Sequence, residues 1–189
     1  MISWWLLGVC FTVAGFFAWR DEYKKAEQLK ARFESTISVS AGRQVNKSVI
    51  TAYTDEITYF RARIDLIGIE PVGNIEAHIT TIRKDGEQFP LVEEARLAIH
   101  GGSPGLAWLK EGVAGFIDII RIAPKDNPVL ALAWTYATVK PHMFETGHTY
   151  QMDVSITSDT TRTVRCTFEF NWTGDRDTAE FSLVSTQPS

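Results

Sequence analysis

The segment Gly101–Gly105 reads GGSPG, which has the G-x-S-x-G spacing that presents the nucleophile of serine hydrolases on a tight turn. In those enzymes the backbone N–H of the residue after the serine helps to stabilise the oxyanion. Here that residue is Pro104, which has no N–H. The motif therefore lacks a part that the chemistry needs, and we expect a surface loop at this point.

Three potential metal ligands, His142, Glu145 and His148, follow one another in the segment PHMFETGHTY. Imidazole and carboxylate groups can converge on a cation, but the chain contains no H-x-H, H-E-x-x-H or C-x-x-C pattern. Ligands from one loop alone make a poor metal site, so we predict neither a metal nor another cofactor. His78 and His100 fall on polar faces of predicted strands and are expected to be exposed.

Asp118 is the charged residue whose surroundings are hardest to predict. It lies in GFIDIIRI, where Phe116, Ile120 and Ile122 share its face if the alternation is regular. A carboxylate facing inward would need a partner or a raised pKa, which is typical of a site residue. We favour the other interpretation, in which Asp118 lies at a strand edge or end and accepts hydrogen bonds from backbone N–H groups.

The elements that must position these residues show the period-two alternation of β-strands from about Ile57 to Val184. In each of four segments, apolar residues alternate with polar ones, which indicates one dry and one wet face. The residues predicted to face inward are Phe60, Ala62, Ile64 and Leu66; Ile75, Ala77 and Ile79; Tyr150, Met152, Val154 and Ile156; and Val164, Cys166, Phe168, Phe170 and Trp172.

Further strands are predicted over Ala95–His100, Phe116–Ile122, Val129–Ala137 and Ala179–Leu183, with Gly, Pro, Asn and Asp clusters between them. About eight short strands without intervening helices predict a mainly β domain. The expected architecture is an antiparallel, immunoglobulin-like β-sandwich, and a small β-barrel is the alternative.

The segments ARIDLIGIEPVGNIEAHITTI, GFIDIIRIA and FETGHTYQMDVSI resemble the immunoglobulin-like β-sandwich domains of uncharacterised bacterial single-pass membrane-anchored proteins. In that family a first strand leads through a Pro-containing turn to a second, and a late Gly-x-x-Tyr turn opens another strand. The resemblance covers most of residues 57–184 and implies the fold alone, because the family has no assigned catalytic residues. The Cys…Trp…Cys signature of antibody domains is missing.

The chain begins with an uncharged run, Ile2–Trp19, which would span about 27 Å as a helix and is long enough for a thin hydrocarbon core. Trp4 and Trp5 at one end and Trp19 and Arg20 at the other are predicted anchors at the membrane interface. A cleaved signal peptide is the alternative. It would require basic residues before the run and a small-x-small cleavage site after it, whereas no Lys or Arg precedes this run and it ends in the bulky residues Phe16, Phe17 and Trp19.

Basic residues follow the predicted span and none precedes it, so the positive-inside rule places the rest of the chain in the cytoplasm. We therefore expect a single-pass protein of the inner (cell) membrane with a cytoplasmic soluble domain. Cys10 lies in the span and Cys166 in the soluble part, so they are not expected to form a disulfide.

Four parts are expected along the chain: a transmembrane and juxtamembrane helix (1–34), a linker or first strand (35–56), the β-sandwich (57–185) and a short tail (186–189). A strand around Val45–Tyr53 is one candidate within the second part. Ala26, Leu29 and Phe33 form a short apolar stripe that could join helices in a homo-oligomer, although we favour a solvated stalk.

Charge argues against nucleic acid as a partner. After Glu34 the chain contains 14 of the 19 basic and 19 of the 23 acidic residues, which leaves a net charge of −5. The phosphate backbone of nucleic acids would repel such a domain. The bilayer, through the N-terminal helix, and a protein are the partners that the sequence predicts.

The function that the sequence favours is a non-catalytic module for protein interaction or scaffolding. Its candidate interaction loop contains Leu106, Trp108 and Leu109, which would be costly to expose unless they cover the core or meet a partner. The alternative is a ligand-sensing barrel lined by residues such as Trp134, Tyr136 and Tyr150, which would signal through oligomerisation of the membrane helix. An enzyme is the least favoured class.

Overall fold

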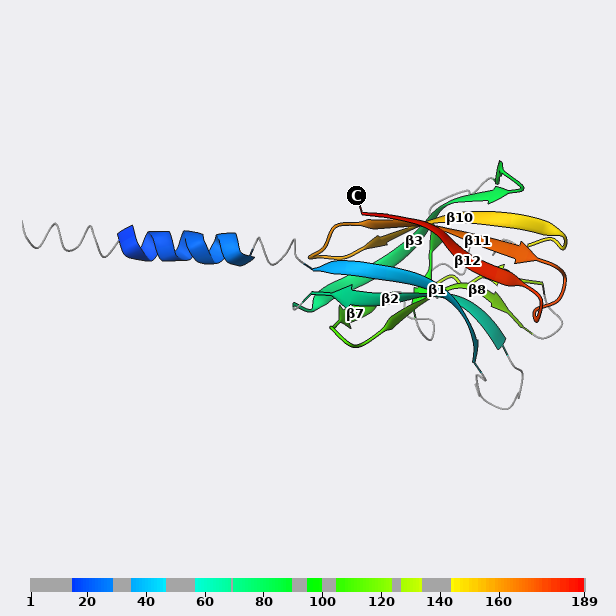
Figure 1. Ribbon diagram of the computed structural model, residues 1–189, viewed down its shortest axis with the longest axis horizontal. Helices are drawn as coiled ribbons and strands as arrows, with labels where there is room; N and C mark the ends of the chain where they lie inside the picture. Colours follow the sequence, from blue (N-terminus) through cyan, green and yellow to red (C-terminus); the bar gives the residue numbers. More distant parts are fainter. Residues whose placement is uncertain are drawn as a thin grey trace, which may run out of the picture. The chain divides into compact units, whose positions relative to one another are not determined.

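The computed structural model describes residues 15–28, 35–46, 57–68, 70–89, 95–99, 105–123, 127–133 and 144–188. The chain divides into two compact units, Met1–Glu34 and Ser35–Ser189. The first unit contains a helix over residues 15–28, and the second is built from β-strands (Figure 1).

Aromatic side chains line one face of the helix. Successive ring centroids are 6.1 Å apart between Phe16 and Trp19 and 5.6 Å apart between Trp19 and Tyr23, as a spacing of three and four residues requires. Trp19 and Arg20, two of the predicted anchors, lie in this helix, and Trp19 is 60% exposed. Trp4 and Trp5 lie outside the described residues.

Across the described ranges, the structure has no helix that is both long and apolar enough to cross a membrane. Of the predicted span Ile2–Trp19, only residues 15–19 belong to those ranges.

The strands of the second unit form two antiparallel sheets (Figure 1). The first sheet contains, in order, β1 (Thr36–Asn46), β2 (Ile57–Ile67), β8 (Gly115–Ile122) and β6 (Ala98–Ile99), with β9 (Val129–Leu130) paired to β8. The second contains β12 (Glu180–Pro188), β11 (Val164–Trp172), β10 (His148–Thr157) and β3 (Val72–Lys84), and β3 also pairs with β4 (Glu87–Phe89), β5 (Ala95–Arg96) and β7 (Leu106–Leu109).

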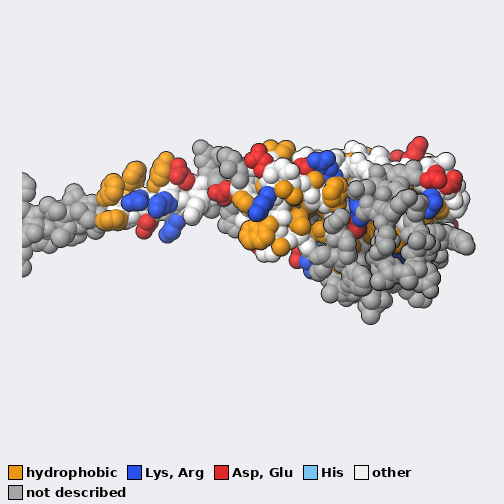
Figure 2. Space-filling view, turned by 90° about the horizontal axis from the view of Figure 1, so that it is seen from below, with side chains coloured by type: hydrophobic (Ala, Val, Ile, Leu, Met, Phe, Trp, Pro, Cys, Tyr) orange, Lys and Arg blue, Asp and Glu red, His pale blue; other side chains and the backbone are white. Residues whose placement is uncertain are grey.

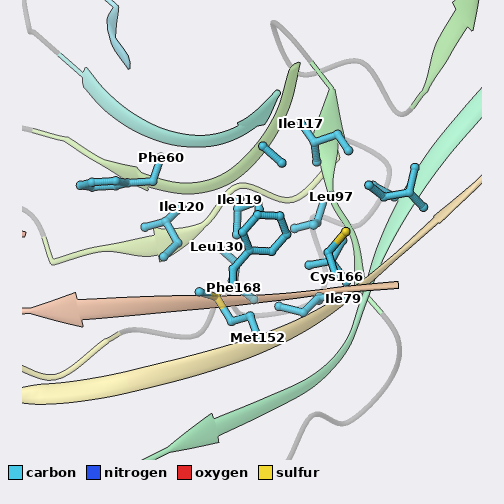
Figure 3. Close-up of a cluster of buried hydrophobic side chains, with 14 of the residues drawn as sticks. Phe60, Ile79, Leu97, Ile117, Ile119, Ile120, Leu130, Met152, Cys166 and Phe168 are labelled. Atoms are coloured by element: carbon cyan, nitrogen blue, oxygen red, sulfur yellow. The ribbon is translucent and has the colours of Figure 1, made fainter. Parts of the chain in front are cut away.

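This arrangement confirms the prediction of a mainly β domain made of two antiparallel sheets. The described strands form two separate sheets, so the closed barrel considered as the alternative is wrong. All of the residues predicted to face inward in the four alternating segments are buried. Figure 3 shows how the core side chains of the two sheets meet. Phe60, Ile117 and Ile120 from the first sheet face Met152 and Phe168 from the second.

The predicted strand Ala95–His100 is divided between the two sheets. Its first part, β5, pairs with β3 in the second sheet, and its second part, β6, pairs with β8 in the first. At the crossing, the N–H of Leu97 donates to the carbonyl of Ala77 at 2.8 Å and its side chain is fully buried. A single pattern of alternation cannot reveal such a crossing, because both halves have the same period.

A β-bulge decides which face of β8 each residue occupies. Phe60 is paired with Ile120 and Arg61 with Asp118, so Ile119 is an extra residue on β8. As a result Ile120 faces the core with Phe60, whereas Asp118 faces outward with Arg61. Regular alternation would have placed Asp118 and Ile120 on one face.

The strand boundaries can be compared with the sequence-based expectation at three places. β1 lies within the part expected to be a linker or first strand (35–56), and Ile37 and Val39 pair with Leu66 and Ile64 of β2. Of the strand expected around Val45–Tyr53, only Val45 and Asn46 are described, and they end β1. The strand expected over Val129–Ala137 is limited to β9 and an isolated bridge at Leu132 in the part of this segment that is described. Residues 186–188, expected in a tail, belong to β12 and pair with β11.

Candidate functional site

The predicted interaction loop is strand β7, and its three apolar residues have different environments. Leu109 is 1% exposed, and Leu106 is half-buried against the core. Trp108 is 63% exposed. It pairs with Gly73 of β3, where an added Cβ would lie 3.3 Å from Cζ3 of the indole, so the ring rests on the glycine backbone. Two of these residues cover the core, and Trp108 is available to a partner.

Ile67 and Val113 lie at the same end of the sandwich as Trp108. Ile67 ends β2 and pairs with Thr36, the residue after Ser35. Val113 lies in the turn between β7 and β8 and donates its N–H to the carbonyl of Lys110 at 3.1 Å. We call this end, where the chain enters the sandwich, the Ser35 end.

A second surface lies where β1 and β12, the edge strands of the two sheets, come close together (Figure 1). We define the edge surface as residues Ser35–Gly42 and Phe181–Pro188. None of these 16 residues is ionisable, whereas average composition would give about four charges. This surface was not among the sequence-based predictions, although the two uncharged runs are a signal that could have revealed it.

Apolar side chains along the edge surface are only partly covered. Val39 and Ala41 of β1 and Phe181 and Leu183 of β12 are half-buried and pack against the core. The register shift between β11 and β12 leaves Val184 as an extra residue, 54% exposed. The described residues therefore cover the core only partly along this surface.

Asp118 is 2% exposed and forms an ion pair with Nε of Arg61, which is 3% exposed. The guanidinium also lies 4.7 Å from the centroid of the Tyr59 ring. The alternation of Phe60, Ala62 and Ile64 assigns Arg61 to the wet face of β2. The register does place Arg61 on the outer face, but its side chain is buried there, so the prediction of a wet environment is wrong. The favoured strand-edge interpretation of Asp118 is also wrong, because β8 lies between β2 and β6.

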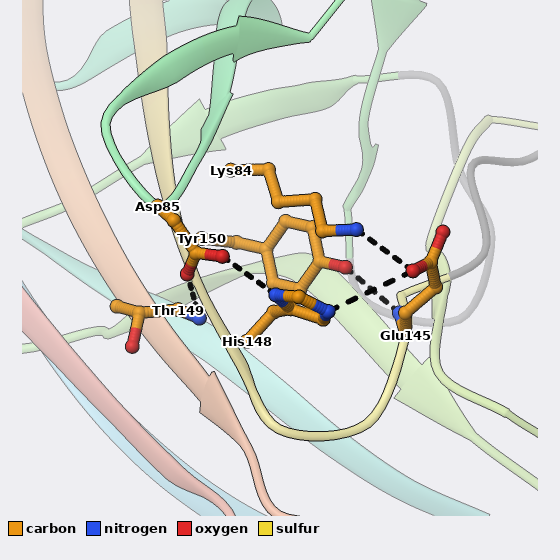
Figure 4. A network of polar contacts seen from close by, with 6 residues as sticks. All are labelled: Lys84, Asp85, Glu145, His148, Thr149 and Tyr150. Carbon is orange, nitrogen blue, oxygen red and sulfur yellow. Dashed lines mark hydrogen bonds and ion pairs between the residues drawn. The ribbon is translucent and has the colours of Figure 1, made fainter.

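A polar network joins the β3–β4 turn to the segment before β10 (Figure 4). Lys84 Nζ lies 2.7 Å from Glu145 Oε2, and His148 Nδ1 lies 2.6 Å from Asp85 Oδ2. The N–H of Thr149 donates to Asp85 Oδ1 at 3.0 Å, and the Asp85 N–H donates to the Thr149 carbonyl at 2.8 Å. The network fixes one loop of the sandwich end opposite to the Ser35 end.

The contacts in this network shift the pKa of three groups. The backbone N–H of Thr149 lowers the pKa of Asp85, and the hydrogen bond to His148 adds to this effect. The hydrogen bond from Lys84 lowers the pKa of Glu145, and the same contact raises the pKa of Lys84. These groups lie at the surface, so solvent screens the interactions.

The candidate metal ligands are only partly described. His142 and His100 lie outside the described residues, whereas Glu145 and His148 belong to the network above. In the described part of the chain, no group of three His, Cys, Asp or Glu side chains is placed to hold a metal ion. His78, expected to be exposed, is half-buried, and its Nε2 lies 3.3 Å from Glu76 Oε2.

The aromatic residues proposed to line a ligand pocket are also only partly described. Tyr150 is 3% exposed, packs edge-on against Phe144 with centroids 4.7 Å apart, and accepts a hydrogen bond from the N–H of Glu145 at 2.8 Å. It is therefore a core residue. Trp134 and Tyr136 lie outside the described residues, as do residues 101–104 of the GGSPG segment.

The fold and these surfaces define a class, a mainly β protein whose two antiparallel sheets enclose one core. Comparison with protein-family models, with curated proteins and with solved structures finds no match for this chain. The resemblance to membrane-anchored immunoglobulin-like proteins therefore stays a prediction.

Proposed function

We propose that this protein is a non-catalytic interaction module, tethered to the cytoplasmic face of the cell membrane, that binds a protein partner along the edge surface. The observation that supports this proposal most strongly is the lack of charge along the edge surface, which covers most of β1 and of β12. Proteins usually protect such edges with charged side chains, because an unpaired edge is a template for another strand.

The strand pairing indicates how a partner would bind. Among the described strands, β12 pairs only with β11 and β1 pairs only with β2. The free N–H and C=O groups of an edge strand can accept an added strand, and the exposed side chains on either side select its sequence. Thr36, Ser40, Ser182 and Thr186 are exposed and uncharged. The expected partner segment is extended, free of charge and rich in β-branched and small polar residues.

The tether is the second part of the proposal. The uncharged run Ile2–Trp19 has the length of a membrane span, and the basic residues that follow it favour a cytoplasmic sandwich. The aromatic face of the helix over residues 15–28 supports a position near the membrane interface, where Trp and Tyr are enriched. An immunoglobulin-like topology, which the resemblance implies, would suit a module of this kind.

Photocrosslinking in native membranes tests the partner surface. A benzophenone amino acid replaces Ser182, which is exposed on β12, in the full-length protein. We expect a discrete covalent adduct with one partner protein. The substitution Val184→Lys should reduce the adduct yield about tenfold or more, because it introduces an unpaired charge into an uncharged interface.

Gln88→Lys is the matched control, because Gln88 is exposed on β4, which lies at the opposite end of the strand order of the same sheet from β12. This variant should keep the adduct of the original protein. The proposal is wrong if both lysine variants reduce the adduct equally, or if neither of them does.

A further inference from the structure

The exposed apolar side chains of the sandwich are concentrated at one end. Four large hydrophobic residues are more than half exposed in the described part of this unit, and three of them, Ile67, Trp108 and Val113, lie at the Ser35 end. The fourth, Val184, belongs to the edge surface. Figure 2 shows apolar side chains gathered at the left end of the sandwich, which is the Ser35 end.

The opposite end is polar. The β3–β4 turn, the segment before β10 and the β11–β12 connection meet there, and their described residues include no large hydrophobic that is exposed. The charged residues of these three loops include Lys84, Asp85, Glu87, Glu145, Asp175 and Asp177. Among the described residues, charged side chains therefore lie at both ends of the sandwich, whereas the exposed large hydrophobic residues lie at the Ser35 end and on the edge surface.

The three apolar residues at the Ser35 end are held by the backbone of three different elements. Ile67 is fixed by its pairing with β1, Trp108 by its pairing with β3, and Val113 by the turn that starts β8. Leu109, next to Trp108, is anchored in the core. The apolar tips are thus presented rigidly, and a surface that covers them need not order them first.

We propose that the Ser35 end rests on the bilayer surface, with Trp108 at the level of the lipid headgroups. This inference depends on the membrane tether of the proposed function. Fifteen residues separate Trp19 from Ser35, and those up to residue 28 are helical, so the tether reaches at most about 40 Å, and the Ser35 end is the end attached to it. A tether of this kind raises the effective concentration of the surface to about millimolar, so a weak contact becomes populated.

The charges around the apolar tips are compatible with this position. The exposed charges at this end are of both signs, with Lys110 and Arg162 against Glu70, Glu111 and Asp159, and Arg63 is paired with Asp65 at 2.8 Å. The indole of Trp prefers the interface, where its ring is in an apolar environment and its N–H meets water and headgroups. In this orientation the acidic loops of the opposite end point away from the membrane, and the edge surface along the side stays accessible.

Fluorescence quenching in vesicles tests this position. The full-length protein, with Cys10→Ser, is reconstituted into phosphatidylcholine vesicles and labelled with an environment-sensitive fluorophore at Ala107→Cys, beside Trp108. A matched sample has the label at Thr178→Cys, which is exposed at the opposite end. Vesicles with headgroup spin labels should reduce the fluorescence at position 107 by about half and leave position 178 unchanged.

Adding Trp108→Ser should lower the quenching at position 107 to the level at position 178. If the protein floats with the vesicles but both labels stay unquenched, the inference is wrong while the tether stands. Equal quenching with and without Trp108 also overturns the inference. Protein that does not float with the vesicles contradicts the tether itself, and the inference with it.

Discussion

Arg61 of β2 and Asp118 of β8 form an ion pair in which the side chains are only 4% and 3% exposed. They are cross-strand neighbours because of the bulge at Ile119, although they are 57 positions apart in the chain. Two charges so fully removed from water stabilise each other. Removing one partner takes this stabilisation from the charge that stays buried, whereas replacing both with apolar groups avoids that cost.

We predict that Asp118→Ala lowers the free energy of unfolding by about 3–5 kcal/mol, because it leaves the Arg61 guanidinium buried without this carboxylate. Urea unfolding of the full-length protein in detergent, followed by tryptophan fluorescence, measures the change. The double substitution Arg61→Met with Asp118→Leu should recover most of the loss. Arg63→Ala, which breaks the exposed Arg63–Asp65 pair, is the control and should change the midpoint little. Equal losses of unfolding free energy in Asp118→Ala and Arg63→Ala would contradict the claim that the Arg61–Asp118 pair is buried.

The packing beneath β7 gives a second prediction. A Cβ at Gly115 would lie 2.8 Å from Cγ1 of Ile64 and 3.1 Å from Cδ2 of Leu106. Gly115→Ala should therefore destabilise the sandwich by about 1–3 kcal/mol through overpacking. Gly42→Ala is the matched control, since no atom lies within 4 Å of its added Cβ. If Gly115→Ala left the free energy of unfolding unchanged in the same urea assay, the packing of Ile64 and Leu106 around Gly115 would be looser than in the structure.

The sequence predicted the core well and the charged residues poorly, for a physical reason. Alternation identified Val164, Cys166, Phe168, Phe170 and Trp172 as inward-facing because β11 is a regular strand with one dry face. Alternation fails at β8, because the extra residue Ile119 exchanges the faces of the residues after it relative to those before it. It also cannot report that an outward-facing arginine is buried, because that depends on contacts distant in sequence.

The pH dependence of stability should depend on the network in Figure 4. The lowered pKa values of Asp85 and Glu145 mean that their contribution is present above their ordinary values of 3.8 and 4.5. It is lost as the pH falls through the lower values of the folded state. Asp85→Asn with Glu145→Gln should therefore flatten the fall of the urea midpoint between about pH 5 and pH 2.

Glu111→Gln, a substitution of an exposed carboxylate in the turn after β7, is the control for this measurement and should leave the slope of the original protein. The hydrogen bond to Glu145 raises the pKa of Lys84. The contribution of Lys84 to stability is therefore present below its ordinary pKa of 10.5 and is lost as the pH rises through the higher value of the folded state. A double variant as acid-sensitive as the original protein would show that the network is not formed.

The thiol of Cys166 should report on the attachment of β12. Burial raises the pKa of this thiol to about 11, and the residue pairs with Thr186 of β12. In a Cys10→Ser background, reaction with a disulfide reagent at pH 8 should be about a hundredfold slower than for a cysteine introduced at Thr178. Urea should abolish the difference. Fast reaction in the native protein would mean that β12 detaches from β11.

The candidate sites could be predicted from the sequence only in part. Trp108 was identified because an isolated run of large apolar residues beside a glycine-rich loop must either cover the core or remain exposed. Which residues of this run cover the core and which remain exposed depends on the pairing of β7 with β3, which no local pattern encodes. The edge surface was not predicted because a lack of charge is not a periodic pattern. The two uncharged runs form one surface only in the fold, where two strands distant in sequence become neighbouring edges.

The proposed tether of the sandwich to the cytoplasmic face of the membrane is tested most directly by fractionation and protease protection. The full-length protein is produced in bacterial cells, and its membranes are washed with alkaline carbonate. We predict that the protein stays in the membrane pellet, and that protease added to intact spheroplasts cleaves the sandwich only after lysis. Release of the protein by carbonate, or digestion of the sandwich without lysis, would contradict the account.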